Sequence, residues 1–240
     1  MKIRNRVFVQ DNLKKDLRLT LDSKTSHYLS NVLRCKVGEC IALFDDKTEW
    51  LSEILEINSK ESKVILRSLL KSYEAKQKIV LYFSPIKKNP TELLIQKCTE
   101  IGVTHFQPIL MERTNLLSFN LDRLNSIVTE ATEQSGQIKI PIIYNPINLK
   151  ELLSKDKDDQ ITLVCSLTEK NNSISQVLKK NKARSYAVLV GPEGDFSYDE
   201  INEINNKKNF FSVSLGETIL KSETASIAAV AILKDVLSHA

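Results

Sequence analysis

The stretch YAVLVGPEGDFSYDE, residues 186–200, has the pattern of a strand, a tight turn and the start of a helix. YAVLV is an apolar run of strand length, and the GPEG that follows has the proline and glycine spacing of a type I turn. Ser197 and Glu200 have the S-x-x-E spacing of a capping box, which predicts a helix beginning after Ser197. In open α/β sheets such a turn lies where ligands bind. Glu193 and Asp195 are not needed for the connection itself, and they are candidates for function.

A second stretch, FFSVSLGETILKSETA at residues 210–225, repeats this arrangement. A strand-like run is followed by a glycine turn, and a polar cluster at residues 221–224 opens an Ala-rich apolar helix. Free N–H groups and the helix dipole favour anions and hydroxyl acceptors at such a helix start. Capping by Ser222 or Thr224 is the alternative explanation, and this motif alone leaves both open.

Strand and helix patterns alternate along most of the chain, from about residue 73 onward. This alternation is typical of crossover units and predicts a parallel sheet. The predicted strands are 78–84, 105–110, 160–167, 186–191 and 210–215, and the predicted helices are 91–101, 122–135, 172–180, 197–206 and 223–237.

The N-terminal third has a different pattern, with short β-like runs between turn signals. These runs predict strands at 6–10, 41–46, 49–58 and 62–70, with one helix at 23–39 closed by Gly38. Several short strands with a single helix favour a small barrel. We therefore predict a β-barrel domain over residues 1–72 and an α/β domain over residues 73–240.

The α/β domain lacks the common ligand-binding fingerprints of its fold class. The chain has only six glycines, and no GxG, GxxxxGK[ST] or GxSxG pattern occurs. These absences exclude a Rossmann dinucleotide loop, a P-loop and a hydrolase nucleophile elbow. The sheet must hold its ligand in another way.

Composition and charge set further bounds. Hydrophobic residues make up 42% and charged residues 27% of the chain, the balance of a globular protein. Residues 1–72 hold fourteen Lys and Arg against ten Asp and Glu, whereas the remainder is balanced at twenty each, so the net charge of +4 comes from the N-terminal third. A solvated basic surface is the ordinary explanation, but this is also the sign expected of a module that contacts phosphates.

Targeting and metal signals are missing from the sequence. There is no apolar run long enough to span a membrane and no apolar segment of a secretory signal near the start, so we expect a cytoplasmic protein. The cysteines form no CxxC pair and have no histidine at metal-ligand spacing, and we expect free thiols and no metal at Cys35, Cys40, Cys98 and Cys165.

Taken together, the two C-terminal motifs resemble the RsmE family, the 16S ribosomal RNA uracil-N3 methyltransferases of the SPOUT class. GPEGDFSYDEI (191–201) followed by LGETILKSETASIAAVAIL (215–233) is similar to the cofactor-binding half of these enzymes. The resemblance continues through IQKCTEIGVTHFQPILMERT (95–114), EATEQSGQIKIP (130–141) and HYLSNVLRCKVGE (27–39). It therefore covers nearly the whole chain in order.

The resemblance implies a PUA-like N-terminal barrel that binds RNA and a SPOUT-type α/β domain with a trefoil knot. It also implies that S-adenosylmethionine is held in the knotted loops, largely by backbone groups, and that the chain forms a homodimer with a contribution from the last helix. The implied substrate is N3 of a specific uridine in the 16S rRNA of the small ribosomal subunit. No metal is implied.

Matched position by position, the family's cofactor site falls on three loops of this chain. The implied cofactor-binding residues are Ser166, Leu167, Leu189, Gly191, Pro192, Glu193, Gly194, Leu215, Gly216, Ile219, Leu220 and Thr224. The chain departs from the family pattern at a few positions. Asp195 stands where the family often has a second glycine, Lys221 stands where it often has arginine, and Gln137 and Lys139 replace the usual arginines after EQxG. Lysine keeps the charge of arginine but loses its bidentate fork.

Our candidates for catalysis are a proton acceptor and a cation. Uracil N3 must lose a proton for methylation, and we expect Glu223, or secondarily Glu193, to accept that proton or orient the base. Lys221 would stabilise the anionic oxygen that develops. Candidate RNA contacts, each with a solvated surface position as its alternative, are Arg4, Arg6, Arg34, Lys36 and Arg113.

Two other functions fit parts of the sequence. A SPOUT methyltransferase acting on a ribose 2′-oxygen or on tRNA would share the fold, because fold does not fix substrate. A non-catalytic RNA-binding protein could keep the fold without activity. The intact GPEG and LGETIL loops argue against the second alternative. A measurement of S-adenosylmethionine binding distinguishes a methyltransferase from such a non-catalytic protein.

Overall fold

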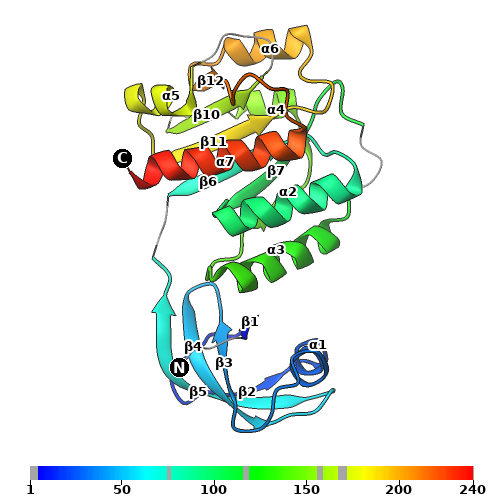
Figure 1. Ribbon diagram of the computed structural model, residues 1–240, viewed down its shortest axis with the longest axis vertical. Helices are drawn as coiled ribbons and strands as arrows, with labels where there is room; N and C mark the ends of the chain where they lie inside the picture. Colours follow the sequence, from blue (N-terminus) through cyan, green and yellow to red (C-terminus); the bar gives the residue numbers. More distant parts are fainter. Residues whose placement is uncertain (1–4, 75–76, 116–118, 156–158, 167–171, 240) are drawn as a thin grey trace. The chain divides into compact units, whose positions relative to one another are not determined.

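The chain forms two compact units in a computed structural model that describes residues 5–74, 77–115, 119–155, 159–166 and 172–239 (Figure 1). The first unit contains the described residues up to 74 together with Thr132–Ile140. The second contains the described residues of 77–131 and 141–239. The sequence-based division assigned the whole of 73–240 to one domain, whereas the structure packs Thr132–Ile140 with the N-terminal unit.

The first unit is built on a five-stranded, mostly antiparallel sheet. Its strand order is β1 (Arg6–Phe8), β3 (Cys40–Phe44), β4 (Thr48–Glu56), β5 (Ser62–Ser72) and β2 (Arg18–Leu21), with β1 parallel to β3. Alternating apolar residues of these strands pack together with Leu29 of the helical segment and form one hydrophobic core. The four strands expected from the sequence are present. The fifth, β2, was missed because it is short and lies between charged residues.

The helix expected at 23–39 is shorter than the sequence indicated. α1 (Ser23–His27) is capped by Asp22, continues as a π-helical turn η1 (Tyr28–Val32), and ends at Leu33. Arg34 then adopts a left-handed backbone conformation with φ +52°, which stops the helix. Gly38 does not close the helix. It lies in a later turn with φ +86°, and its N–H donates to the carbonyl of Ile54 at 2.8 Å.

The second unit contains a parallel sheet, as the alternating pattern predicted. Among the described residues it has seven strands, and each of its recorded pairings is parallel. The order is β12 (Phe210–Val213), β10 (Gln160–Cys165), β11 (Ser185–Val190), β6 (Lys78–Phe83), β7 (His105–Leu110) and β8 (Ile142–Ile143), with β9 (Ile147–Asn148) also paired to β7.

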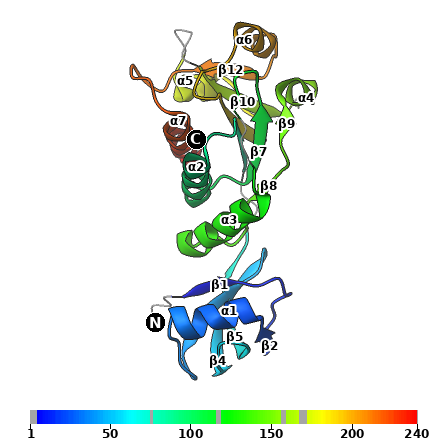
Figure 2. The same ribbon diagram turned by 90° about the vertical axis from the view of Figure 1, so that its right-hand side faces the viewer.

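Helices cover both faces of this sheet (Figure 2). α2 (Lys88–Ile101) and α7 (Ser222–Ser238) lie side by side on one face, and α7 contacts β6 and β11. On the other face, α4 (Leu149–Ser154) and α6 (Tyr198–Asn205) pack on a buried cluster that includes Val80, Leu189 and Phe196. The remaining helices are α3 (Leu121–Ser135) and α5 (Ile174–Lys180).

These elements confirm the predicted α/β fold class, a parallel-sheet unit preceded by a small β unit. The sequence missed α4, β8 and β9, which are all short. The trefoil knot implied by the resemblance remains a prediction. Within the described part of the chain, no helix combines the length and apolarity needed to cross a lipid bilayer.

Candidate functional site

A cavity of about 410 Å³ lies at the carboxyl ends of three adjacent strands of the second unit. Cys165, Val190 and Val213 are the last residues of β10, β11 and β12, and the sheet register pairs Cys165 with both valines. All three line the cavity. Ligands of open parallel sheets bind at this edge, and the volume is that of a small-molecule site.

One wall of the cavity is the connection from β11 to α6. Gly191, Pro192, Glu193 and Asp195 line the cavity. The N–H of Asp195 donates to the carbonyl of Pro192 at 3.0 Å, so the tight turn spans residues 192–195, one position later than the sequence indicated. A side chain at Gly191 would place its Cβ 3.2 Å from the ring of Phe196, which explains the glycine.

The capping box predicted for α6 is present. The Oγ of Ser197 accepts a hydrogen bond from the N–H of Glu200 at 3.3 Å, and a carboxylate oxygen of Glu200 accepts from the N–H of Ser197 at 2.9 Å. This box fixes where α6 begins and therefore where the β11 connection ends.

The opposite wall is the connection from β12 to α7, residues 214–221. Each residue of this connection lines the cavity, with Ser222 and Ala225 of α7 behind them. Gly216 has φ +126°, a backbone conformation that side chains other than glycine rarely adopt. The glycine turn seen in the sequence is therefore required by the backbone of this wall.

The start of α7 settles the choice between capping and another role for Ser222. Lys221 is the N-cap residue, and it makes no side-chain capping bond. The buried Ser222 donates its hydroxyl hydrogen to the carbonyl of Gly191 at 2.9 Å, which joins the two walls of the cavity. Capping by Ser222 or Thr224, the alternative considered from the sequence, is not what the structure shows.

The structure brings most of the predicted cofactor-binding residues to this cavity. Those lining it are Ser166, Gly191, Pro192, Glu193, Leu215, Gly216, Ile219 and Leu220, together with the catalytic candidate Lys221. Leu189 does not line it, because its side chain is fully buried within β11. Gly194, Glu223 and Thr224 also lie outside the lining. Leu167 falls outside the described residues.

Several lining residues escaped the sequence reasoning as cofactor contacts. They are Cys165, Val190, Asp195, Val213, Ser214, Glu217, Thr218, Ser222 and Ala225. Three of them are the last residues of strands; the predicted strands included them but ended one or two residues later, at 167, 191 and 215. Glu217 is a further acidic residue of the lining, in addition to Glu193 and Asp195, and Lys221 is its basic residue.

The thiol of Cys165 contributes no reactive nucleophile to this site. Burial raises its pKa to about 12, so the group stays protonated near neutral pH. The described residues also contain no cluster of three or more His, Cys, Asp or Glu side chains suited to a metal ion.

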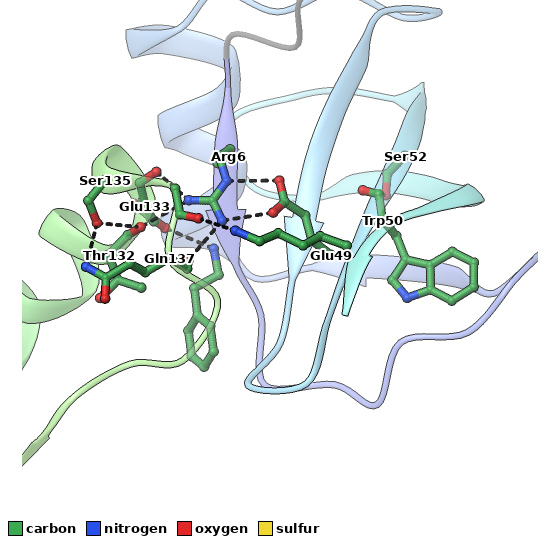
Figure 3. Close-up of polar contacts among 11 residues, drawn as sticks. Arg6, Glu49, Trp50, Ser52, Thr132, Glu133, Ser135 and Gln137 are labelled. Carbon is green, nitrogen blue, oxygen red and sulfur yellow. Dashed lines mark hydrogen bonds and ion pairs between the residues drawn. The ribbon is translucent and has the colours of Figure 1, made fainter. Parts of the chain in front are cut away.

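Arg6, expected from the sequence to contact RNA, is instead occupied within the first unit (Figure 3). Its Nε and Nη2 donate to the two carboxylate oxygens of Glu49 at 2.9 and 3.0 Å. Its remaining donors reach the backbone carbonyls of Thr132, Glu133 and Gln137 at 2.7–3.0 Å. All five guanidinium N–H donors are therefore used, and none remains for a phosphate.

The other candidate RNA contacts have different surroundings. Arg34 and Lys36 are exposed on the loop that follows η1. Arg113 is exposed in the second unit, where its guanidinium donates to the carbonyl of Gly194 at 2.6 Å. Arg4 lies outside the described residues.

Comparison with known proteins places this geometry in a family. Residues 73–234 match the model of an RNA methyltransferase domain, and residues 21–67 match that of an RNA methyltransferase PUA domain. A ribosomal RNA small subunit methyltransferase E from Rickettsia conorii is 33% identical over 98% of this chain and 97% of its own. The ribosomal RNA small subunit methyltransferase E of Mesomycoplasma hyopneumoniae is 31% identical, and the match covers 90% of this chain and 93% of that protein.

A solved structure has the same fold throughout. The crystal structure of ribosomal RNA small subunit methyltransferase E from Neisseria gonorrhoeae, bound to S-adenosyl methionine, is 26% identical, with a TM-score of 0.88 and 97% of each chain covered. The fold and the cavity at the sheet edge thus define an RNA methyltransferase with a PUA-like domain. The chain belongs to the ribosomal RNA small subunit methyltransferase E family, the RsmE family indicated by its sequence.

Proposed function

We propose that this protein transfers a methyl group from S-adenosylmethionine to N3 of one uridine in the 16S rRNA of the small ribosomal subunit. The observation that carries the proposal is the cavity at the ends of β10, β11 and β12, lined by the two loops whose sequences resemble the cofactor loops of the family. S-adenosylmethionine supplies an electrophilic methyl group, and the protein supplies alignment with the acceptor nitrogen.

The residues present fit this cofactor. The cavity is lined mainly by residues of the loops, among them the apolar Leu215, Ile219 and Leu220 and the polar Ser166 and Ser214. Exposed backbone N–H and C=O groups can bind adenine and the amino-acid part of the cofactor without a glycine-rich dinucleotide loop. We assign cofactor binding to the predicted residues that line the cavity, and we retain Leu189, Gly194 and Thr224 only as supports of the loops.

Proton removal from uracil N3 requires a base close to the cavity. We propose Glu223 for this role, because it lies in the first turn of α7, directly after Lys221 and Ser222 of the cavity lining. Glu193 is the second candidate, and its place in the lining itself favours it. Lys221, which also lines the cavity, would stabilise negative charge on a uracil oxygen.

RNA binding involves both units in this proposal. N3 lies on the pairing edge of uracil, so the base must leave its stack to reach the cavity. We assign residues 1–72 to RNA binding and the methyltransferase function to residues 73–240. The exposed Arg34 and Lys36 are the candidate phosphate contacts of the first unit, and no hydrogen bond or ion pair of their side chains is recorded among the described residues.

Assembly and location complete the proposal. We propose a homodimer in which α7 contributes to the interface, supported by its exposed Ala231 and by Ile232, which is 40% exposed despite being a large apolar residue. We propose that the protein acts in the cytoplasm, where the small ribosomal subunit is found.

Transfer of labelled methyl groups to small subunits that lack the modification tests this proposal. We expect incorporation of about one methyl group per subunit by the wild-type protein. Removing a general base typically lowers kcat by about 10²–10⁴-fold, so Glu223→Gln or Glu193→Gln should do so with cofactor binding intact. Glu203→Gln, an exposed glutamate on α6, is the matched control. Cofactor binding without transfer to any RNA would contradict the proposal, and absence of cofactor binding would revive the non-catalytic alternative.

A further inference from the structure

We propose that Arg113 is a positioning residue for the cofactor site, which it supports from behind without touching the cavity. The inference rests on the proposed function, because it assumes that the β11 connection holds S-adenosylmethionine. Arg113 was expected from the sequence to contact RNA. The structure gives it a different partner, the backbone of a loop that lines the cavity.

The loop from Gly191 to Ser197 lines the cavity in part. Gly191, Pro192, Glu193 and Asp195 line the cavity, whereas Gly194 and Phe196 do not, and the carbonyl of Gly191 accepts a hydrogen bond from the hydroxyl group of Ser222. At the two positions outside the lining, Nη1 of Arg113 donates to the carbonyl of Gly194 at 2.6 Å, with a longer contact of 3.4 Å to the carbonyl of Phe196. Hydrogen bonds from a charged donor are among the stronger ones.

The aliphatic part of Arg113 also packs closely against position 194. A Cβ added to Gly194 would lie 3.2 Å from Cδ of Arg113. Gly194 does not have a left-handed backbone, so alanine would be compatible with its local conformation. A side chain at Gly194, which was expected from the sequence to bind the cofactor, would therefore push the Arg113 side chain aside by a few tenths of an ångström.

The segment that carries Arg113 is itself fixed to the same loop and to the sheet. The N–H of Glu112 donates to a carboxylate oxygen of Glu200 at 2.8 Å, and that carboxylate also forms the capping box of α6. The hydroxyl group of Thr114 accepts from the N–H of Met111 and forms a 2.8 Å hydrogen bond with that of Ser84. The guanidinium of Arg113 therefore projects from an anchored turn, which allows it to set the position of residues 194–196.

Calorimetric titration with S-adenosylmethionine tests the proposal. Losing a hydrogen bond of about 1 kcal/mol corresponds to about a fivefold change in affinity, so we expect Arg113→Ala to weaken cofactor binding by about that factor. The KM for S-adenosylmethionine should rise accordingly, with kcat at saturating cofactor and the KM for small subunits nearly unchanged. Arg113→Lys should recover most of the affinity, because an ammonium group can still donate to one carbonyl.

A double-mutant cycle separates positioning from general damage. Gly194→Ala should weaken cofactor binding in the wild-type background but have no additional effect in Arg113→Ala, because the atom that it meets is gone. Arg123→Ala, which removes an exposed arginine paired with Glu92, is the matched control and should leave cofactor affinity unchanged.

The contrary outcomes are distinct. Unchanged S-adenosylmethionine affinity in Arg113→Ala with a raised KM for the small subunit would overturn the proposal in favour of an RNA contact. Additive effects of Gly194→Ala and Arg113→Ala would contradict the packing argument. Failure of the wild-type protein to bind S-adenosylmethionine would instead refute the proposed function.

Discussion

The hydroxyl group of Ser222, at the first position of α7, donates a 2.9 Å hydrogen bond to the carbonyl of Gly191, which directly follows β11. The two residues are distant in sequence, and each lies in one of the two motifs that identified the chain. Ser222 is buried, so this hydrogen bond is shielded from water. It is the direct physical link between the two walls of the cavity.

Ser222→Ala should loosen that link. Leaving the buried carbonyl of Gly191 without this donor should cost about 1–2 kcal/mol of folding stability and weaken S-adenosylmethionine binding. Urea unfolding and calorimetric titration would measure the two effects. Ser238→Ala, at the exposed far end of the same helix, is the control and should change neither quantity. Unaltered cofactor affinity in Ser222→Ala would show that the link does not shape the site.

Asp195 adopts a left-handed backbone conformation, with φ +57°. The resemblance to the family implied a glycine at this position, and a left-handed backbone is the conformation that favours glycine. Asp195→Gly should stabilise the protein by up to about 1 kcal/mol, because glycine reaches this conformation without a steric penalty. Asp195→Val should destabilise it, because β-branched residues are the least tolerant of positive φ. We expect the urea unfolding midpoint to be highest for Asp195→Gly, intermediate for the wild type and lowest for Asp195→Val. The reverse order would contradict the strain argument.

Arg6 stabilises the first unit through Glu49 and three backbone carbonyls. Its side chain is 15% exposed and that of Glu49 is 11% exposed. Removing one partner of a buried ion pair typically costs about 3–5 kcal/mol, and we expect Arg6→Ala to lose that much. Arg67→Ala, which breaks the exposed pair with Glu53, should cost about 1 kcal/mol or less. Equal losses in the two variants, measured by urea unfolding, would contradict this account.

Buried thiols make the protein sensitive to alkaline conditions. Burial raises the pKa of the Cys98 thiol well above its usual value of 9.0. Above pH 9 the unfolded chain therefore releases protons that the folded chain retains, and the free energy of unfolding falls as pH rises. Each such thiol should contribute up to about 1.4 kcal/mol per pH unit in this window.

Urea unfolding at pH 7.5 and pH 10 measures this effect. The wild-type protein should lose stability between the two values, and Cys98→Ala should lose less, although it is less stable at pH 7.5. An identical pH slope in wild type and Cys98→Ala would contradict the burial argument.

The sequence predicted the strands and helices that carry strong periodicity, and with them the parallel sheet. The capping box of Ser197 and Glu200 was also readable, because it depends on residues close in the chain. The tight turn was predicted one residue too early, at 191–194 instead of 192–195, because both registers of GPEGD satisfy turn preferences. The closeness of the Phe196 ring to Gly191 cannot be seen in the sequence.

The roles that depend on distant partners could not be predicted. Arg6 was taken for an RNA contact because nothing local indicates its partners in Glu49 and residues 132–137. Gly194 was assigned to the cofactor because its packing partner, Arg113, lies far away in the sequence. The family motifs pointed to loops that line the cavity, but they did not separate residues that line it from those that lie outside the lining.

The chemical identity of the methylated nucleoside tests the central claim most directly. Small ribosomal subunits lacking the modification would be incubated with the protein and labelled S-adenosylmethionine, and the RNA would be digested for nucleoside mass spectrometry. The account predicts label in N3-methyluridine at a single position of 16S rRNA. Label in a 2′-O-methyl nucleoside, or in tRNA alone, would contradict the proposed substrate.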